Sequence, residues 1–285
     1  MNTVKWDEIK IRCSGLGKIM SESRDNPPIT QVQLARILEL EEKSIRTPKQ
    51  TEELATLLQK QINSQKVTLS DTCTTYLLEV YAWEKYGKES TSGDRKGRQV
   101  EKGKISEDDS ITLLSLIDKR MYVKNTQRVF NDFLSGEPDL GDNPDIMKSK
   151  LIIDIKSNWD LINFLNTINR PLDKGYEKQL SGYKAITGAD EAIVAYCLVD
   201  CPQMLINDEE RRLLYAMGSA TEESPEYLKK AAKLRNNLTF SEIPQSLRVN
   251  KIPVPKIDMN PIYERVEHCR KWLKNFEEIH ENMNK

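Results

Sequence analysis

Apolar residues in the first part of the chain recur at the three-to-four spacing of amphipathic helices. This spacing predicts helical structure over 30–64 with a break at Thr47-Pro48, a helix over 70–86 and another over 97–118. The stretch 87–97 is rich in glycine and charged residues and is expected to be a loop. Residues 1–70 are therefore predicted to form a mainly helical N-terminal part.

Further along, the hydrophobic pattern becomes that of short strands separated by helices. Strands are expected at 128–140, 150–157, 191–199 and 247–253. Helices are expected at 159–167, 173–187, 206–237 and from 260 onwards. The continuous apolar run of 191–199 is typical of a strand that is covered on both faces.

The order of these elements predicts an α/β (α+β) fold, with a small mixed β-sheet flanked by helices. We expect a single domain over 1–285, and a chain of this length can bury a sizeable core. Within it, 1–70 would be the helical N-terminal part, 71–200 the core, and 201–285 a helical C-terminal part that ends in a long helix.

The charged residues are almost balanced, with 43 Lys+Arg against 44 Asp+Glu and a formal net charge of −1. This balance excludes a histone-like polybasic protein and an acidic disordered chain. No run of 18 apolar residues is present, so no transmembrane helix is expected. The first residues lack the apolar stretch of a secretory signal, and we expect a cytoplasmic protein.

Five cysteines are scattered along the chain, at Cys13, Cys73, Cys197, Cys201 and Cys269. Cys197 and Cys201 are four residues apart, but the only histidines, His268 and His280, are far away in the sequence. A zinc site would need two more ligands nearby, and a disulfide framework would need secretion. We therefore expect reduced and mostly buried thiols.

Two acidic residues and a lysine flank a predicted turn over 141–149. Asp139 precedes this turn, and Asp154 and Lys156 lie on the strand that follows it. Residues two apart on a strand point to the same face, so Asp154 and Lys156 share one face while their apolar neighbours anchor the other. A hairpin through 141–149 would bring Asp139 beside Asp154. Paired carboxylates suit a hard cation such as Mg²⁺ better than zinc.

Polar side chains upstream and downstream are placed to reach the same point. Glu107 follows Gly103 by one helical turn, and the glycine leaves room for a close approach. Glu101 is a rival for the position of a third carboxylate. Gln179 and Tyr183 are four residues apart on a predicted helix and therefore share one of its faces.

Taken in order, these residues resemble the signature of the PD-(D/E)xK nuclease superfamily, in its RecB-type branch. The matching positions are Gly103-x-x-x-Glu107, Pro138-Asp139, Asp154-x-Lys156 and Gln179-x-x-x-Tyr183. The stretch 176–183 is most similar to the lambda-exonuclease-like recombination exonucleases of phages and prophages. The resemblance covers about residues 70–200 and implies a restriction-endonuclease-like core. Some members of the branch carry a four-cysteine iron–sulfur cluster, which the cysteines here do not supply.

The resemblance implies that a metal-bound water hydrolyses a phosphodiester bond. Asp139 and Asp154 would hold one or two Mg²⁺ ions, with the carbonyl of Ile155 as a further ligand and Mn²⁺ as a substitute. Glu107 would complete the set of metal ligands, directly or through water. Lys156 would orient the attacking water, and would act as its base if its own pKa were depressed.

Two residues behind the metal ligands complete the implied catalytic set. Gln179 would donate a hydrogen bond to the groups that bind the metal, and Tyr183 would support the helix that presents it. Read without the resemblance, each is an ordinary residue on a helix surface or in a core, and it is the order of the four motifs that favours the functional interpretation.

Contacts to DNA are implied at three places in the chain. Arg12 and Ser14 resemble the short segment that opens the nuclease domain of this family and lies near a DNA phosphate. A serine that caps a helix is the alternative for Ser14. Basic residues could also meet the DNA backbone, namely Arg95, Lys96, Arg98, Lys102 and Lys104. Trp159 and Tyr176 could stack on bases, and core packing is the alternative for each.

The resulting hypothesis is an exonuclease that acts on double-stranded DNA ends, in the 5′→3′ direction, for recombination. Similar exonucleases are rings, commonly trimers, and work with a single-strand-annealing protein, so both are expectations for this chain. The first alternative is an endonuclease of the same fold, either restriction-like or structure-specific. The second is a catalytically silent module that binds DNA or a partner protein.

Overall fold

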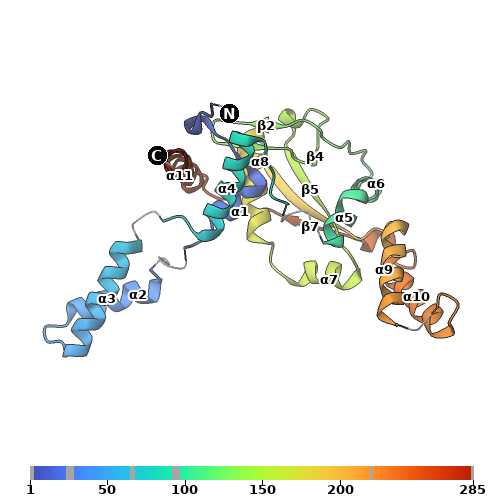
Figure 1. The fold of residues 1–285 in the computed structure, drawn as a ribbon, viewed down its shortest axis with the longest axis horizontal. Helices are drawn as coiled ribbons and strands as arrows, with labels where there is room; N and C mark the ends of the chain where they lie inside the picture. Colours follow the sequence, from blue (N-terminus) through green and yellow to red (C-terminus); the bar gives the residue numbers. More distant parts are fainter. Residues whose placement is uncertain (1–2, 24–28, 65–67, 92–96, 219–220, 284–285) are drawn as a thin grey trace. The chain divides into compact units, whose positions relative to one another are not determined.

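The computed structural model describes residues 3–23, 29–64, 68–91, 97–218 and 221–283, and Figure 1 shows the elements in chain order. The chain divides into two compact units. One consists of 1–9, 15–89 and 260–285, and the other of 10–14 and 90–259. None of the described helices has the length and apolar character that crossing a lipid bilayer requires.

The first unit is helical in its described residues. Its elements are η1 (Trp6–Glu8), α1 (Leu16–Ile19), α2 (Gln31–Glu42), α3 (Pro48–Ser64), α4 (Asp71–Tyr86) and α11 (Asn260–Asn282). The predicted helices over 30–64 and 70–86 are confirmed, with 30–64 divided into α2 and α3. Ser70 caps α4 because its side chain accepts the N–H of Cys73, and the helix ends at Gly87 in the left-handed conformation.

An aromatic cluster holds α11 against the other helices of this unit. Trp6 stacks on Tyr81 with ring centroids 5.2 Å apart, and Phe276 meets the same tyrosine edge-on. The buried ammonium of Lys85 forms an ion pair with Glu277 beside these rings. The last helix of the sequence therefore belongs to the unit that the N-terminal helices form.

The second unit combines two small sheets with helices. Its helical elements are α5 (Arg98–Ile105), α6 (Glu107–Asp118), η4 (Ile146–Lys148), α7 (Leu161–Asn169), α8 (Lys174–Thr187), α9 (Gln203–Ala216), α10 (Pro225–Leu238) and η5 (Gln245–Leu247). Its strands are β1 (Ile11–Arg12), β2 (Val129–Phe130), β3 (Leu134–Gly136), β4 (Leu140–Gly141), β5 (Leu151–Ser157), β6 (Glu191–Cys197) and β7 (Val249–Pro253). One sheet has the order β1-β3-β2 and the other β4-β5-β6-β7. This mixed architecture confirms the predicted fold class.

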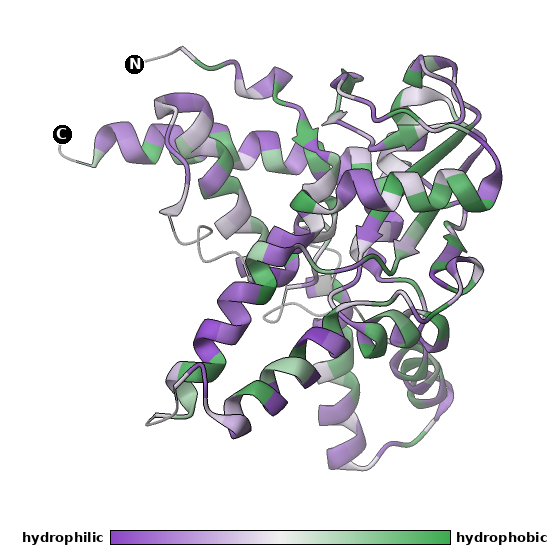
Figure 2. Cartoon of the chain, turned by 90° about the vertical axis from the view of Figure 1, so that its right-hand side faces the viewer, coloured by the Kyte–Doolittle hydropathy of each residue, from purple (hydrophilic) through white to green (hydrophobic). Residues whose placement is uncertain are grey.

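The four-stranded sheet carries the hydrophobic core of the second unit. Strand β5 is antiparallel to β4 and parallel to β6, and β6 is antiparallel to β7. Ile153 and Ile155 of β5 pack with Ala195 and Cys197 of β6 and with Leu114 of α6. Figure 2 shows the strands of this sheet as mainly hydrophobic. The face of β5 predicted to be apolar is therefore buried, and Ile152 and Asp154 on the opposite face are buried as well.

The predicted single helix over 97–118 is wrong, because the structure has two helices that meet at Ser106. The N–H of Ser106 bonds to the carbonyl of Lys102, and its own carbonyl accepts the N–H of Ser110. This bend lets α6 pack apolar residues against the sheet while Lys102 of α5 reaches the segment that follows β5.

The predicted strand over 128–140 is likewise divided, into β2, β3 and β4. Between β2 and β3, the side chain of Asn131 accepts the N–H groups of Phe133 and Leu134 and closes a turn. After β3, Pro138 interrupts the pairing because proline has no N–H to donate. Strand β1, which pairs parallel to β3, lies where the sequence predicted no strand.

All five cysteines are buried and free, as the sequence predicted. Burial raises the pKa of Cys13 and of Cys197 to about 12. At neutral pH these thiols are therefore protonated, and they behave as small apolar side chains.

Candidate active site

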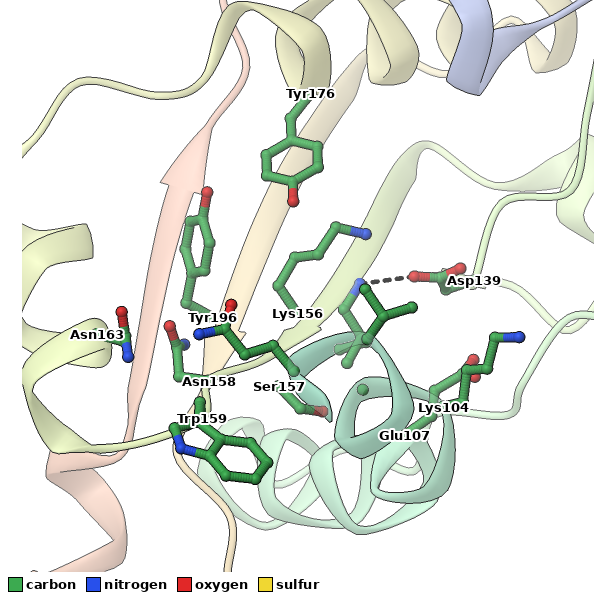
Figure 3. A pocket seen from close by; sticks show the side chains of 14 residues that line it. Lys104, Glu107, Asp139, Lys156, Ser157, Asn158, Trp159, Asn163, Tyr176 and Tyr196 are labelled. Atoms are coloured by element: carbon green, nitrogen blue, oxygen red, sulfur yellow. Dashed lines mark hydrogen bonds between the residues drawn. The ribbon is translucent and has the colours of Figure 1, made fainter. Parts of the chain in front are cut away.

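The hairpin of β4 and β5 brings Asp139 to the middle of β5. The two strands are antiparallel, with Leu140 opposite Ile153. Immediately before β4, Oδ2 of Asp139 accepts a hydrogen bond from the main-chain N–H of Ile155, at 2.8 Å (Figure 3). The hairpin predicted from the turn-rich stretch is thus confirmed, and it places Asp139 next to the strand that carries Asp154.

Asp154 and Lys156 share the other face of β5. Asp154 is only 1% exposed, and Nζ of Lys156 lies 2.5 Å from its Oδ2. The same ammonium lies 5.0 Å from the centroid of the Tyr176 ring. Figure 3 shows Lys156 and Asp139 pointing toward one another. Two carboxylates and a lysine therefore meet at one point.

Burial and mutual charge shift the titration of these three groups. Burial, followed by the negative charge of Asp154, raises the pKa of Asp139 to about 7. Burial also raises the pKa of Asp154. For Lys156, burial alone would lower the pKa, but the charges of Asp154 and Asp139 outweigh it and raise the pKa. The depressed pKa that a lysine base would need is not found in this arrangement, which favours the ammonium form of Lys156.

Helix α8 presents Gln179 and Tyr183 to the back of the carboxylate pair. Nε2 of Gln179 donates to Oδ1 of Asp154 at 3.3 Å and to the hydroxyl of Tyr183 at 3.1 Å. The Tyr183 ring packs over Gly136 of β3, where a Cβ atom would lie 2.3 Å from a ring carbon. The structure therefore brings all three motif residues, Asp154, Gln179 and Tyr183, into one hydrogen-bonded chain.

A cavity of about 520 Å³, which we call the active-site cavity, opens in front of these groups. Asp139, Lys156 and Glu107 line it, together with Gly103, whose Cα hydrogen faces open space. Glu101 is exposed and does not line it. Of the two rivals for a third carboxylate, Glu107 is therefore the one the structure places here.

Glu107 does not join the aspartates in a closed group. Its Oε2 lies 2.8 Å from Nζ of Lys124, and its charge acts on Asp139 and Asp154 as the weakest of the influences that raise their pKa. Among the residues that the structure describes, no three acidic, histidine or cysteine side chains come together as a metal cluster. The expected role of Glu107 as a metal ligand stays a prediction.

Several polar and aromatic residues of the cavity were not among the candidates from the sequence. They are Asn158, Asn163 and Tyr196. Tyr196 stands opposite Lys156 in the pairing of β5 with β6, so it could have been found only once the parallel register was known. Asn125 supports the cavity from outside, since its main-chain N–H bonds to the carbonyl of Asp139 at 2.8 Å and its side chain to that of Pro138 at 2.8 Å.

The residues proposed for DNA contact lie in different places. Arg12 and Ser14 are exposed, and neither lines the active-site cavity. Arg95 and Lys96 lie outside the described residues. Their DNA-binding roles stay predictions. Trp159 and Tyr176 both line the cavity, and Trp159 also packs against a small apolar cluster under it.

Lys102 was expected at the DNA backbone, and this expectation is wrong. Its side chain is 0% exposed, and Nζ donates to the carbonyls of Asn158 (2.6 Å), Trp159 (3.1 Å) and Val199 (2.8 Å). Burial lowers its pKa to about 8. The lysine thereby joins the segments that follow β5 and β6, and it fixes the main chain of one wall of the cavity.

The donor set suits Mg²⁺. Oδ2 of Asp154 is buried and is paired with the Lys156 ammonium, 2.5 Å away. The second carboxylate, Asp139, has a raised pKa because it is buried beside the negative charge of Asp154. Mg²⁺ is commonly held by one or two carboxylates, with waters and substrate oxygens as its other ligands. Two aspartates beside an open cavity fit this pattern.

The fold is shared with a solved exonuclease structure. No protein-family model matches this sequence, and no curated protein sequence does either. A phage-related exonuclease from Haemophilus somnus 129PT is 21% identical, with 95% of this chain and 96% of that chain covered and a TM-score of 0.59. An alkaline exonuclease from Laribacter hongkongensis is 12% identical, with 76% and 87% covered and a TM-score of 0.49.

The first of these comparisons shows that the chain has the fold of a phage-related exonuclease over almost its whole length. The resemblance to lambda-exonuclease-like nucleases, which rested on four short motifs, is thereby confirmed at the level of the fold. The four motifs lie on α5–α6, immediately before β4, on β5 and on α8, all in the second unit.

Proposed function

We propose that this protein is a metal-dependent deoxyribonuclease that hydrolyses phosphodiester bonds from the ends of duplex DNA. The observation that carries this proposal is the meeting of Asp139, Asp154 and Lys156 at the wall of an open cavity. The fold shared with a phage-related exonuclease supports it. From the sequence resemblance we further propose 5′→3′ action in recombination, a single-strand-annealing partner and a ring-shaped oligomer, with a trimer expected.

Each residue of the site has a role that follows from its contacts. Asp139, Asp154 and the carbonyl of Ile155 would hold Mg²⁺, and Mn²⁺ could replace it. The bound ion would supply a water of lowered pKa and would offset charge on the phosphate. Lys156, as an ammonium, would donate hydrogen bonds to the attacking water or to a phosphate oxygen. Gln179 would hold the carboxylate of Asp154 in one orientation.

Digestion of DNA tests the proposal. Linear and covalently closed circular duplexes of one sequence are incubated with Mg²⁺, with Mn²⁺ or with EDTA, and linear substrates labelled at either end report the direction. We expect the linear duplex to be degraded with either metal, the 5′ label to be released first, and the circle to survive. The products would carry 5′-phosphate and 3′-hydroxyl ends.

Two site variants and two matched controls test whether hydrolysis takes place at this site. Asp154→Asn and Lys156→Ala should abolish digestion. Asp190→Asn and Lys150→Ala are matched controls, because this exposed ion pair (3.5 Å) lies at the other end of β5 and should be dispensable. Full activity of Asp154→Asn would show that the site is elsewhere.

The same experiment separates the alternatives. Cleavage of the closed circle would identify an endonuclease of this fold. Binding of DNA without hydrolysis, and without dependence on metal, would identify a silent DNA-binding module.

A further inference from the structure

A second cavity adjoins the active-site cavity. Its volume is about 580 Å³, and two residues, Gln99 and Trp159, line both cavities. Arg98 of α5, Arg212 of α9 and Leu234 of α10 belong to its remaining walls. Figure 1 shows α5, α9 and α10, all elements of the second unit. A flexible chain that leaves the active-site cavity past Trp159 would enter this second cavity.

The second cavity carries an excess of positive charge. Arg98 is largely buried and forms an ion pair with Glu209. Arg212 is exposed, and among the residues that the structure describes it has no acidic partner. Burial, and after it the charge of Arg212, lowers the pKa of Arg98. Two guanidinium groups thus face one carboxylate, and an anion between them would relieve their repulsion.

The rest of the wall is apolar and aromatic. Trp159 and Leu234 pack against a buried cluster that includes Leu205 and Leu238. Nucleotides are commonly held by a guanidinium group on the phosphate and an aromatic or apolar surface on the base. The second cavity offers both, whereas the described lining of the active-site cavity includes Asp139 and Glu107 and no arginine.

We infer that the second cavity binds the phosphate backbone of the nucleic-acid strand whose end occupies the active-site cavity, with Arg212 on a phosphate and Trp159 between the two sites. This inference rests on the proposed function, because it takes the active-site cavity to hold nucleic acid. It adds a direction to that function, since one strand would run from β5 past Trp159 to the helix pair α9–α10.

Binding of a labelled duplex with a short single-stranded end, measured by fluorescence anisotropy in Ca²⁺ over a series of salt concentrations, tests the inference. Arg212→Ala should raise Kd by about 5- to 10-fold and reduce the slope of log K against log salt by about 1. Arg211→Ala is the matched control, because Arg211 is the preceding residue of α9, is exposed, and pairs with Asp208 at 3.3 Å.

A second variant changes binding in the opposite direction. Glu209→Gln removes the carboxylate that lines the second cavity in the described part of the chain and leaves Arg98 without its ion-pair partner, so Kd should fall and the salt slope should increase. Damage to folding could not tighten binding in this way. Equal affinity of wild type, Arg212→Ala and Glu209→Gln at every salt concentration would overturn the inference.

The inference and the proposed function fail in distinguishable ways. If linear DNA is digested and digestion needs Asp154, but Arg212→Ala binds as the wild type does, then the second cavity is not on the path of the strand. If DNA is bound through Arg212 but never hydrolysed, the nuclease function is wrong and the binding surface remains. If no DNA is bound at all, both are wrong.

Discussion

Oδ2 of Asp139 lies 2.8 Å from the main-chain nitrogen of Ile155, the residue between Asp154 and Lys156. One carboxylate is thus held by the same strand that carries the other two charged groups. Because this hydrogen bond uses the main chain of β5, it depends on the pairing of β4 with β5 and on no side chain of β5. Removing the charge of Asp139 is therefore expected to change metal binding and the rate of digestion while the hairpin of β4 and β5 stays in place.

Asp139→Asn keeps an oxygen that can accept the N–H of Ile155 but loses the negative charge. We expect the rate of digestion in Mg²⁺ to fall by more than about 100-fold, because loss of a metal ligand should exceed the cost of losing a residue behind the ligands. Initial rates measure this, and calorimetry should show weakened Mg²⁺ binding. An Asp139→Asn protein that still binds Mg²⁺ normally would contradict the ligand assignment.

The raised pKa of Asp139 predicts an unusual dependence of metal-free stability on pH. The pKa is near 3.8 in the unfolded chain and about 7 in the folded protein, so between these values the folded protein binds more protons at this group. The free energy of unfolding therefore falls as pH rises through this window and is constant above it. In EDTA, Tm should drop between pH 5 and pH 8, and Asp139→Asn should reduce the drop by roughly 2–4 °C, or about 1 kcal/mol.

Mg²⁺ provides the control for this measurement. Because the ion favours ionised carboxylates, it should raise Tm more at pH 8 than at pH 5. The same pH dependence in wild type and Asp139→Asn, both in EDTA, would show that this carboxyl group titrates normally.

Gln179→Ala removes the hydrogen bond to Asp154 without touching a charge. We expect digestion to slow by about 10- to 100-fold and the Mg²⁺ concentration at half-maximal rate to rise, as for other groups behind metal ligands. Tyr183→Phe keeps the Gln179–Asp154 bond and is the milder control, with an effect of a few-fold. If Tyr183→Phe slows digestion more than Gln179→Ala does, then Tyr183 and not Gln179 is the more important of the two for the site.

Gly136→Ala tests the packing behind Gln179. The new methyl group would lie 2.3 Å from a carbon of the Tyr183 ring and 3.2 Å from Sγ of Cys13, so the ring has to move. We expect a loss of stability of about 1–3 kcal/mol and a reduced rate of digestion. For stability alone, Gly103→Ala is the control, because its methyl group would meet no atom within 4 Å and it improves helix propensity. A Gly136→Ala protein as stable as the wild type would show that the Tyr183 ring can move aside with little loss of free energy.

Lys102→Met should destabilise the second unit although it replaces a buried charge with an apolar side chain of similar length. Three carbonyl groups would lose their donor, and we expect a loss of roughly 2–4 kcal/mol in the free energy of unfolding. Lys104→Met, on the exposed side of α5, should change stability by less than about 0.5 kcal/mol. Urea denaturation of both variants measures the difference, and equal stabilities would show that water replaces the ammonium.

The sequence was most informative where local geometry decides the outcome. Asp154 and Lys156 had to share a face because strand side chains alternate, and the turn-rich stretch after Asp139 had to reverse the chain. Gln179 and Tyr183 had to share a face because they are four residues apart in a helix. These rules need no knowledge of distant residues, and the structure agrees with each of them.

Features that depend on distant contacts were missed. The burial of Lys102 depends on carbonyl groups more than 50 positions further along the chain, which no local pattern indicates. The two-residue strand β1 exists only through its pairing with β3. The second cavity brings α5 beside α9, and Arg212 has no distinguishing neighbours in the sequence.

The hydrogen bonds of Lys102 also bear on how this protein could be redesigned. Its three hydrogen bonds are made to main-chain oxygens, so the wall at residues 158 and 159 is held whichever side chains stand there. Asn158 and Trp159 are therefore natural positions for a library of variants, because their side chains can be exchanged while the backbone beneath them stays fixed. The side chains at these two positions can thus be varied separately from Asp154 and Lys156 of β5.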